Sequence, residues 1–162
     1  MNPSLNITVK ADPSAAEDAL QQIGKKIQQA VRPAAHKAAE LLYKEVLRNV
    51  ERRPTSKTGN LRNAIYHAFS EDNSDEHQAT YHISWNHKKA PHGHLVEFGH
   101  LQRYQVMYDQ RTGTFWTDKT RPLPQPKQVP AAPFVRPAAA LMPKAAELAE
   151  EYILSQLEDE LQ

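Results

Sequence analysis

The chain has 162 residues, enough for one domain with a hydrophobic core or for one domain that carries an arm. It contains no cysteine, which excludes a disulfide framework, thiolate catalysis and any cysteine-ligated zinc site. No apolar run approaches the roughly 18 residues of a membrane-spanning helix, and residues 1–10 lack the pattern of a signal peptide. We therefore expect residues 1–162 to form one soluble domain in a reducing compartment, with no membrane partner.

The formal net charge of +1 hides an uneven distribution along the chain. Ten lysines and arginines against three acids give the segment from Lys25 to Arg62 a local charge of +7. The last eighteen residues carry six acids and no base. This polarity favours a basic face that binds an anion or a head-to-tail contact between copies, although two solvated helix faces would give the same pattern.

A long helix is the first predicted element. Asp12-Pro13-Ser14 is typical of a helix start, with the serine as N-cap and Glu17 completing a capping box. Helical composition continues to about Arg53, and Pro54 ends it. Pro33 either kinks this helix or starts a second one, because proline lacks an amide donor and crowds the preceding turn. The apolar stripe consists of Ala35, Ala38, Ala39, Leu42, Val46 and Val50.

Short strands are predicted next. Residues 63–69 are rich in β-compatible side chains, and residues 80–86 alternate apolar with polar, as a half-buried strand does. The acidic residues 70–76 between them read as a hairpin loop. Residues 94–98, bounded by glycines, are predicted to form a third strand.

Residues 101–128 are predicted to form a projecting β-arm with a proline-rich loop. Residues 104–108 and 114–117 can pair as a hairpin, whereas the prolines of residues 121–127 exclude regular pairing and favour an extended segment. The arm's candidate contacts with other copies are Tyr104, Tyr108, Phe115 and Trp116.

The segment from Pro133 to Pro137 leads into a closing helix. One predicted apolar face of that helix holds Leu141, Ala145, Leu148 and Tyr152, and an adjacent row holds Ala149, Ile153, Leu157 and Leu161. The expected fold class is α+β: a long N-terminal helix and a C-terminal helix packed on a small antiparallel β-sheet, with a projecting β-hairpin arm.

The sequence contains few candidate catalytic or metal-binding residues. Four histidines lie close together: His87, His92, His94 and His100. His92 and His94 would share a strand face suited to zinc or nickel. Glu97 does not share that face, and the ammonium groups of Lys88 and Lys89 would repel a metal cation. There is no Gly-x-Ser-x-Gly motif and no phosphate-binding glycine loop. We expect no enzyme activity, metal or cofactor, and keep a small metal-dependent hydrolase using His92, His94 and His100 as an alternative.

Glu97 stands out because apolar Val96 and Phe98 flank it. A carboxylate needs a partner if it is buried, and Arg62 or Arg136 could supply one. An exposed glutamate on the wet face of the sheet is the other reading.

The basic segment could also bind phosphates, since lysine and arginine give affinity without sequence preference. Tyr43 is the only phenylalanine, tyrosine or tryptophan in this segment, so the basic residues are not interleaved with a series of aromatic residues for base stacking. No helix-turn-helix or zinc-finger pattern is present. A nonspecific DNA-binding protein using the Lys25–Arg62 helix therefore remains an alternative.

Three motifs occur in a fixed order: Thr58-Gly59-Asn60-Leu61-Arg62, Val96-Glu97-Phe98-Gly99-His100, and Pro133-Phe134-Val135-Arg136-Pro137-Ala138. Together they resemble the tail-component family of long-tailed, lambdoid-type bacteriophages, over about residues 14–155. The family reads approximately Thr-Gly-x-Leu-Arg, then aromatic-x-Glu-Phe-Gly-Thr, then Pro-Phe-Leu-x-Pro-Ala. His100 departs from the usual threonine, and the insertion at 101–128 is longer than in the simplest members.

The resemblance implies a virion structural protein, assembled in the host cytoplasm, that completes the tail or joins it to the head. It implies contact with other neck and tail proteins, a homo-oligomeric ring, and proximity to packaged DNA without sequence specificity. The structural or interface residues it implies are Gly59, Leu61, Arg62, Glu97, Phe98, Gly99, Phe134, Arg136 and Pro137. Gly59 would permit the turn out of the helix, Arg62 would offer a fork of donors, and Phe134 would plug the closing helix.

Overall fold

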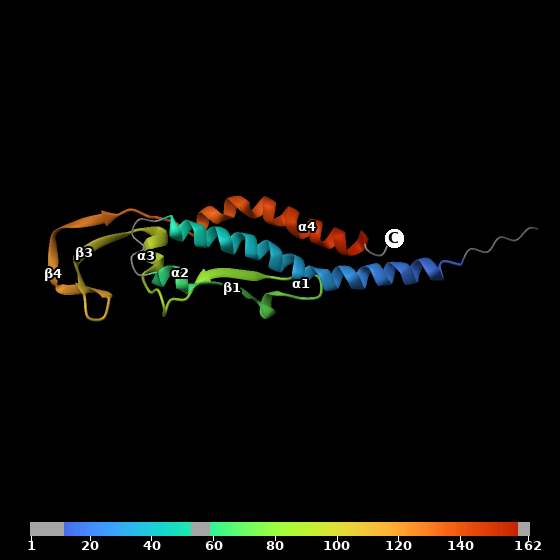
Figure 1. Ribbon diagram of the computed structural model, residues 1–162, viewed down its shortest axis with the longest axis horizontal. Helices are drawn as coiled ribbons and strands as arrows, with labels where there is room; N and C mark the ends of the chain where they lie inside the picture. The colour runs from blue at the N-terminus through green and yellow to red at the C-terminus, as the bar shows by residue number, and fades with distance from the viewer. Residues whose placement is uncertain (1–11, 53–58, 159–162) are drawn as a thin grey trace, which may run out of the picture.

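The long helix α1, Ser14–Glu51, runs along most of the molecule in the computed structural model, which describes residues 12–52 and 59–158 (Figure 1). Helix α4, Met142–Glu158, lies along one side of α1, and a β-hairpin lies along the other (Figure 1). A second hairpin projects from the end of the molecule where α1 finishes. The described chain is thus an elongated α+β body with an arm, as predicted.

Helix α1 begins and continues differently from the prediction. Ser14 is its first helical residue and Pro13 is the N-cap, with no side-chain cap, so the predicted capping box is wrong. Instead, the Ser14 amide donates to the Asp12 carboxylate at 3.0 Å. Pro33 lies inside the uninterrupted helix, because packing of the turns on both sides offsets the one amide hydrogen bond that proline removes. Pro54, expected to end the helix, lies outside the described residues.

The core is built around the C-terminal half of α1. Its buried members are Val46, Val50, Leu61, Ala64, Ile65, Ala90, Phe134 and Ala138. They come from α1, the short helix α2, Asn60–Ala64, the first strand, the loop that holds Ala90, and the 3-10 turn η2, Arg136–Leu141, with the residues just before it. Farther along, alanines let α1 and α4 approach closely, since Ala30, Ala34 and Ala145 are also buried. The alanine-rich composition therefore serves helix packing around a small core.

Strands β1, Ile65–Phe69, and β2, Tyr81–Trp85, form the predicted antiparallel hairpin, with Ile65 opposite Trp85. The loop between them carries a 3-10 turn, η1, Glu71–Asn73. The His67 ring lies 4.8 Å from the Tyr43 ring of α1, centroid to centroid, which places this hairpin against that helix.

The third predicted strand is wrong: Gly93–Phe98 is a short helix, α3. A short apolar run has the same composition in a strand and in a buried helical turn, so its pattern alone could not separate the two. Glycine at position 93 lets this turn lie directly against Trp85, because a Cβ there would lie 2.2 Å from Trp85 Nε1.

The predicted arm is present as a second antiparallel hairpin of β3, His100–Asp109, and β4, Thr114–Val129. Its strands include the proline-rich segment, so the expectation that prolines exclude regular pairing there is wrong in part. Tyr104 pairs with Pro122 and Gln102 with Lys127, and the register shifts between these pairs. Prolines are tolerated because this two-stranded ribbon leaves half of each strand's amides facing outward.

The faces predicted for the closing helix agree in part with α4. Ala145 is buried and Leu141, Ala149 and Tyr152 are half-buried, whereas Leu148 is exposed. The Lys37 ammonium lies 4.2 Å from the centroid of the Tyr152 ring, which fixes where α4 lies on α1. Leu161 lies outside the described residues.

Candidate structural and interface site

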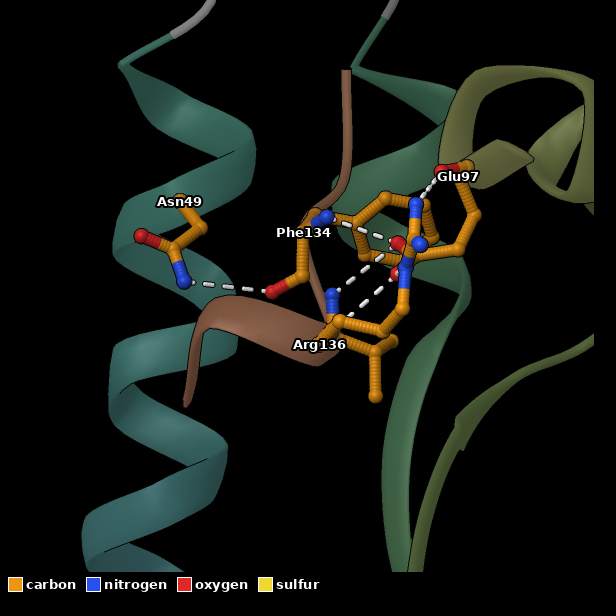
Figure 2. Close-up of polar contacts among 5 residues, drawn as sticks. Asn49, Glu97, Phe134 and Arg136 are labelled. Carbon is orange, nitrogen blue, oxygen red and sulfur yellow. Dashed lines mark hydrogen bonds and ion pairs between the residues drawn. The ribbon is translucent and has the colours of Figure 1, made fainter. Parts of the chain in front are cut away.

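The Glu97 carboxylate binds the chain segment that enters the closing helix (Figure 2). Its Oε2 accepts hydrogen bonds from the amides of Phe134, at 2.7 Å, and Val135, at 3.0 Å. Its Oε1 accepts from the Arg136 amide and from Arg136 Nε, each at 3.1 Å. We call these four residues the Glu97 cluster. Only 2% of Glu97 is exposed, so this carboxylate is buried and fully partnered.

Arg136 is the arginine that pairs with Glu97, one of the two partners considered from the sequence. Its Nη2 also donates to the Glu97 carbonyl oxygen at 2.6 Å, and its guanidinium lies 5.0 Å from the centroid of the Phe98 ring. Arg136 is half exposed, so one edge of the guanidinium meets solvent. The ion pair is therefore reinforced by the planar donor fork that lysine lacks.

The pKa of Glu97 is lowered from its ordinary value of 4.5. Burial acts in the opposite direction and would raise it, but the donors from the Phe134, Val135 and Arg136 amides and from the Arg136 side chain outweigh burial. The cluster therefore favours the charged carboxylate in the folded state.

Phe134 links the cluster to the hydrophobic core. Its side chain is fully buried and lies 5.4 Å from the Trp85 ring, centroid to centroid. Its carbonyl oxygen accepts a hydrogen bond of 3.1 Å from Asn49 of α1 (Figure 2). Asn49 and Trp85 were not predicted as site residues, although a polar side chain beside the apolar stripe of α1 was a usable signal. The Glu97 cluster thus joins α1, α3 and the approach to α4.

Both predicted turn glycines have a positive φ, which side chains disfavour. Gly59 has φ +69° at the start of α2, and Gly99 has φ +73° between α3 and the arm. A Cβ on Gly99 would lie 2.7 Å from the Ala131 amide nitrogen and 2.8 Å from the Val129 carbonyl oxygen. Gly99 therefore lets the two ends of the arm meet at the body.

Arg62 does not pair with Glu97. Its Nε donates to Glu51 Oε1 instead, between α2 and the end of α1, and both side chains are about half exposed. This bond raises the pKa of Arg62. Leu61, next to it, is buried in the core. These two residues link the end of α1 to α2. Pro137 is the second residue of the η2 turn, directly after Arg136 of the Glu97 cluster.

The arm exposes the aromatic side chains that were predicted as contacts. Tyr104, Tyr108, Phe115 and Trp116 are all substantially exposed, and the rings of Tyr108 and Phe115 pair at 4.7 Å between centroids. Between the arm and the body is a hollow of about 880 Å³, lined mainly by apolar side chains. An exposed aromatic surface of this kind typically marks a protein contact.

The candidate metal ligands are not assembled. His92 and His100 both line the hollow, whereas His94 lies in α3 and does not. Within residues 12–52 and 59–158, no group of three or more histidine, aspartate or glutamate side chains is placed to hold a metal ion. The geometry offers no support for the metal-dependent hydrolase.

The model of the HK97-gp10-like family, described as "Bacteriophage HK97-gp10, putative tail-component", matches residues 14–99. The chain belongs to this family. The match spans α1 through α3 and ends at Gly99, where the arm begins. It therefore confirms the resemblance over residues 14–99, which include Gly59, Arg62 and Glu97, whereas the third motif, from Pro133 to Ala138, lies outside the match.

No curated protein and no solved structure matches the chain. In the part of the chain that the structure describes, no helix is both long and apolar enough to cross a membrane. As a member of an HK97-gp10-like tail-component family, the chain is a structural component of a phage tail, found in the virion with other tail proteins.

Proposed function

We propose that this chain is a structural protein of the phage neck or tail end that completes the tail or joins it to the head. In this proposal residues 1–162 act as one unit, with the arm as part of it, and several copies form a ring. The observation that carries the proposal is the braced body with a projecting, aromatic-rich arm, in a chain of a tail-component family. The role is structural rather than enzymatic.

The Glu97 cluster supports this role because it fixes the arm to the body. The Ala132 amide donates to the Val96 carbonyl oxygen at 2.9 Å, directly beside the cluster. An arm with a fixed base can present side chains to a neighbour without first losing much conformational freedom. The proposed interface residues therefore divide into a supporting set around Glu97 and a contacting set on the arm.

Charge gives a candidate for one contact within the ring. The basic face of α1 would meet the acids Glu147, Glu150, Glu151 and Glu158 of a neighbour's α4, all of which are exposed. Asp159 and Glu160, also part of the acidic tail, lie outside the described residues. Native mass spectrometry across a salt series tests this contact, and an assembly insensitive to salt would contradict it.

Deletion of the gene tests the proposed role itself. Electron micrographs of the resulting particles should show separate full heads and tails if the protein joins them, or tails of abnormal length if it completes the tail. Normal, infectious particles without the protein would overturn the proposal.

The DNA-binding alternative has weaker support. Lys44, Arg48, Arg52 and Arg62 form ion pairs with the three acids of the basic segment, Glu40, Glu45 and Glu51. Those pairs reduce the positive charge available to phosphates. A gel-shift assay at moderate salt separates the two functions, since the structural role predicts no retarded complex.

A further inference from the structure

The hollow between the arm and the body combines apolar and basic side chains. Its apolar lining on the arm consists of Leu101, Tyr104, Val106, Phe115 and Trp116, which are between 36% and 56% exposed. Lys89 from the body and Arg103 from the arm also line it, and none of its described lining residues is acidic. A segment that carries leucines beside carboxylates would therefore match this surface in both polarity and charge.

In the described part of the chain, the two cations of the hollow have no acidic partner. Neither Lys89 nor Arg103 forms an ion pair there. Asp118 of the arm pairs with Arg121 instead, and the carboxylate of the Glu97 cluster is fully partnered. Lys89 and Arg103 are both exposed, so a carboxylate from another molecule can reach them.

Charge distinguishes the segments of the chain that could fill the hollow. Of the segments outside the described residues, 1–11 contains one lysine and no acid, and 53–58 contains two bases and no acid. The loop at 70–80 carries four acids but no large apolar side chain. By contrast, residues 154–162, which we call the acidic segment, contain three leucines, three acids and no base. The acidic segment therefore has the combination that the hollow requires.

Helix α4 already presents leucine and acid together on its outer face, where the acidic segment begins. Leu154 is 58% exposed. Exposed glutamates lie three, four and seven residues from it along the helix, so they surround it on one face: Glu147, Glu150, Glu151 and Glu158. Within residues 12–52 and 59–158, none of these four glutamates forms an ion pair.

Helix α4 carries the acidic segment away from the hollow of its own copy. It begins beside the base of the arm and runs toward the other end of the molecule (Figure 1). Its 17 residues span about 25 Å at the helical rise. The three residues from Glu158 to Leu161 extend about 11 Å at most. A hollow that receives the acidic segment would therefore belong to another copy.

We propose that the acidic segment of one copy docks in the hollow under the arm of a second copy, with its carboxylates at Lys89 and Arg103. The contact joins two different surfaces, so it repeats from copy to copy and closes into a ring when the rotation allows. This inference rests on the proposed ring and names the surfaces that meet in it. It differs from a contact with the basic face of α1, where Lys44 and Arg48 are already paired.

Charge reversal on both sides of the contact tests the inference by analytical ultracentrifugation of the full-length protein. One variant carries Asp159→Lys and Glu160→Lys, and the other carries Lys89→Glu and Arg103→Glu. Each alone should weaken self-association by about tenfold to about a hundredfold, because like charges then meet. An equal mixture should restore association, since the reversed surfaces match each other and the unchanged surfaces still match. A mixture no stronger than its components would overturn the inference.

The matched control reverses two charges on α1, with Lys25→Glu and Lys44→Glu. Mixing this variant with the Asp159→Lys, Glu160→Lys protein should not restore association. Restoration here, and not with the Lys89→Glu, Arg103→Glu protein, would overturn the inference in favour of the α1 contact. Thermal melts should stay close to the wild type, because the four substituted lysine and arginine side chains are exposed.

Cysteine cross-linking locates the contact independently, because the chain has no cysteine of its own. Leu161→Cys protein is mixed with Val106→Cys protein and oxidised, and we expect a mixed disulfide dimer as the main product. The variant with both cysteines should give a ladder of larger species. A monomer closed by an internal disulfide as its main product would overturn docking between copies.

Failure of this inference can be told apart from failure of the proposed function. A wild-type protein that stays monomeric, or that assembles without the mixed cross-link, overturns the docking contact. The structural role would survive that result if gene deletion still produced defective tails. Normal particles after deletion would overturn the proposed role and leave the docking contact to be judged by charge reversal and cross-linking.

Discussion

At the scale of single residues, a buried carboxylate that accepts four hydrogen bonds determines how the arm and α4 are held. Glu97→Ala leaves three backbone amides without their acceptor, so we expect it to lower the free energy of unfolding by about 3–5 kcal/mol. Glu97→Gln keeps the shape and one acceptor oxygen and should cost about 1–3 kcal/mol. Urea denaturation measures both values.

The control for these variants is Glu51→Gln, which removes the half-exposed partner of Arg62. Exposed ion pairs contribute little, so this variant should unfold close to the wild type. If Glu51→Gln were as damaging as Glu97→Ala, the special role of the Glu97 cluster would be refuted.

The lowered pKa of Glu97 also predicts how stability depends on pH. Since the unfolded chain takes up this proton near pH 4.5 and the folded chain only at lower pH, the contribution is complete above about pH 4.5. It is lost as the pH falls through the folded pKa. The stability difference between wild type and Glu97→Gln should therefore shrink as the pH drops below 4.5, and a difference that grew would contradict the assignment.

Two glycines with a positive φ should respond differently to alanine. Gly99 and Gly113 have φ values of +73° and +66°, but only at Gly99 would a Cβ meet other backbone atoms. Gly113→Ala should cost about 1–2 kcal/mol, the strain of a left-handed residue. Gly99→Ala should cost clearly more, measured by thermal melting, and equal costs would show that the ends of the arm are not tightly packed.

At the scale of elements, the arm should be separable from the body. Within the described residues, every member of the hydrophobic core cluster lies outside β3 and β4, and Gly99 lies against Val129 and Ala131. Replacing residues 100–129 with a short glycine–serine linker should therefore preserve the helical circular dichroism signal and cooperative melting. The same variant should fail to self-associate. Loss of folding would show instead that the arm is part of the core.

Elements with a clear hydrophobic periodicity or a specific turn sequence were predictable from the sequence. The strict alternation in β2, the turn between β3 and β4, and the apolar stripe of α1 each indicated the observed structure. Residues 94–98 were not, because a strand and a helical turn share that short apolar composition. The close approach of Gly93 to Trp85, which has no room for a Cβ, is a tertiary feature that the local sequence does not reveal.

The candidate site was predictable only in part for the same reason. Isolation of Glu97 among apolar residues indicated a buried carboxylate, and Arg136 was one of two possible partners. Three of the four hydrogen bonds to its carboxylate come from donors in the chain backbone. Every residue except proline has a backbone amide donor, so residue type does not show which amides bind a carboxylate. Val135 therefore could not be identified as a partner of Glu97 from the sequence.

At the scale of the whole molecule, the near-zero net charge is the sum of acidic and basic segments that lie at different ends of the molecule. The arm is basic, the first turns of α1 are acidic, and both carry exposed apolar side chains. This arrangement fits a structural role in a tail of the kind indicated by the HK97-gp10-like family.

Quantitative mass spectrometry of purified phage particles tests the central claim, a multi-copy structural role at the tail end or neck, most directly. We predict that the chain is present in intact particles in a fixed number of copies greater than one per tail, and that it stays with the tail when heads are removed or with the joined neck. Complete, infectious particles that lack the chain, or that carry it in no constant proportion to the tail, would contradict the account.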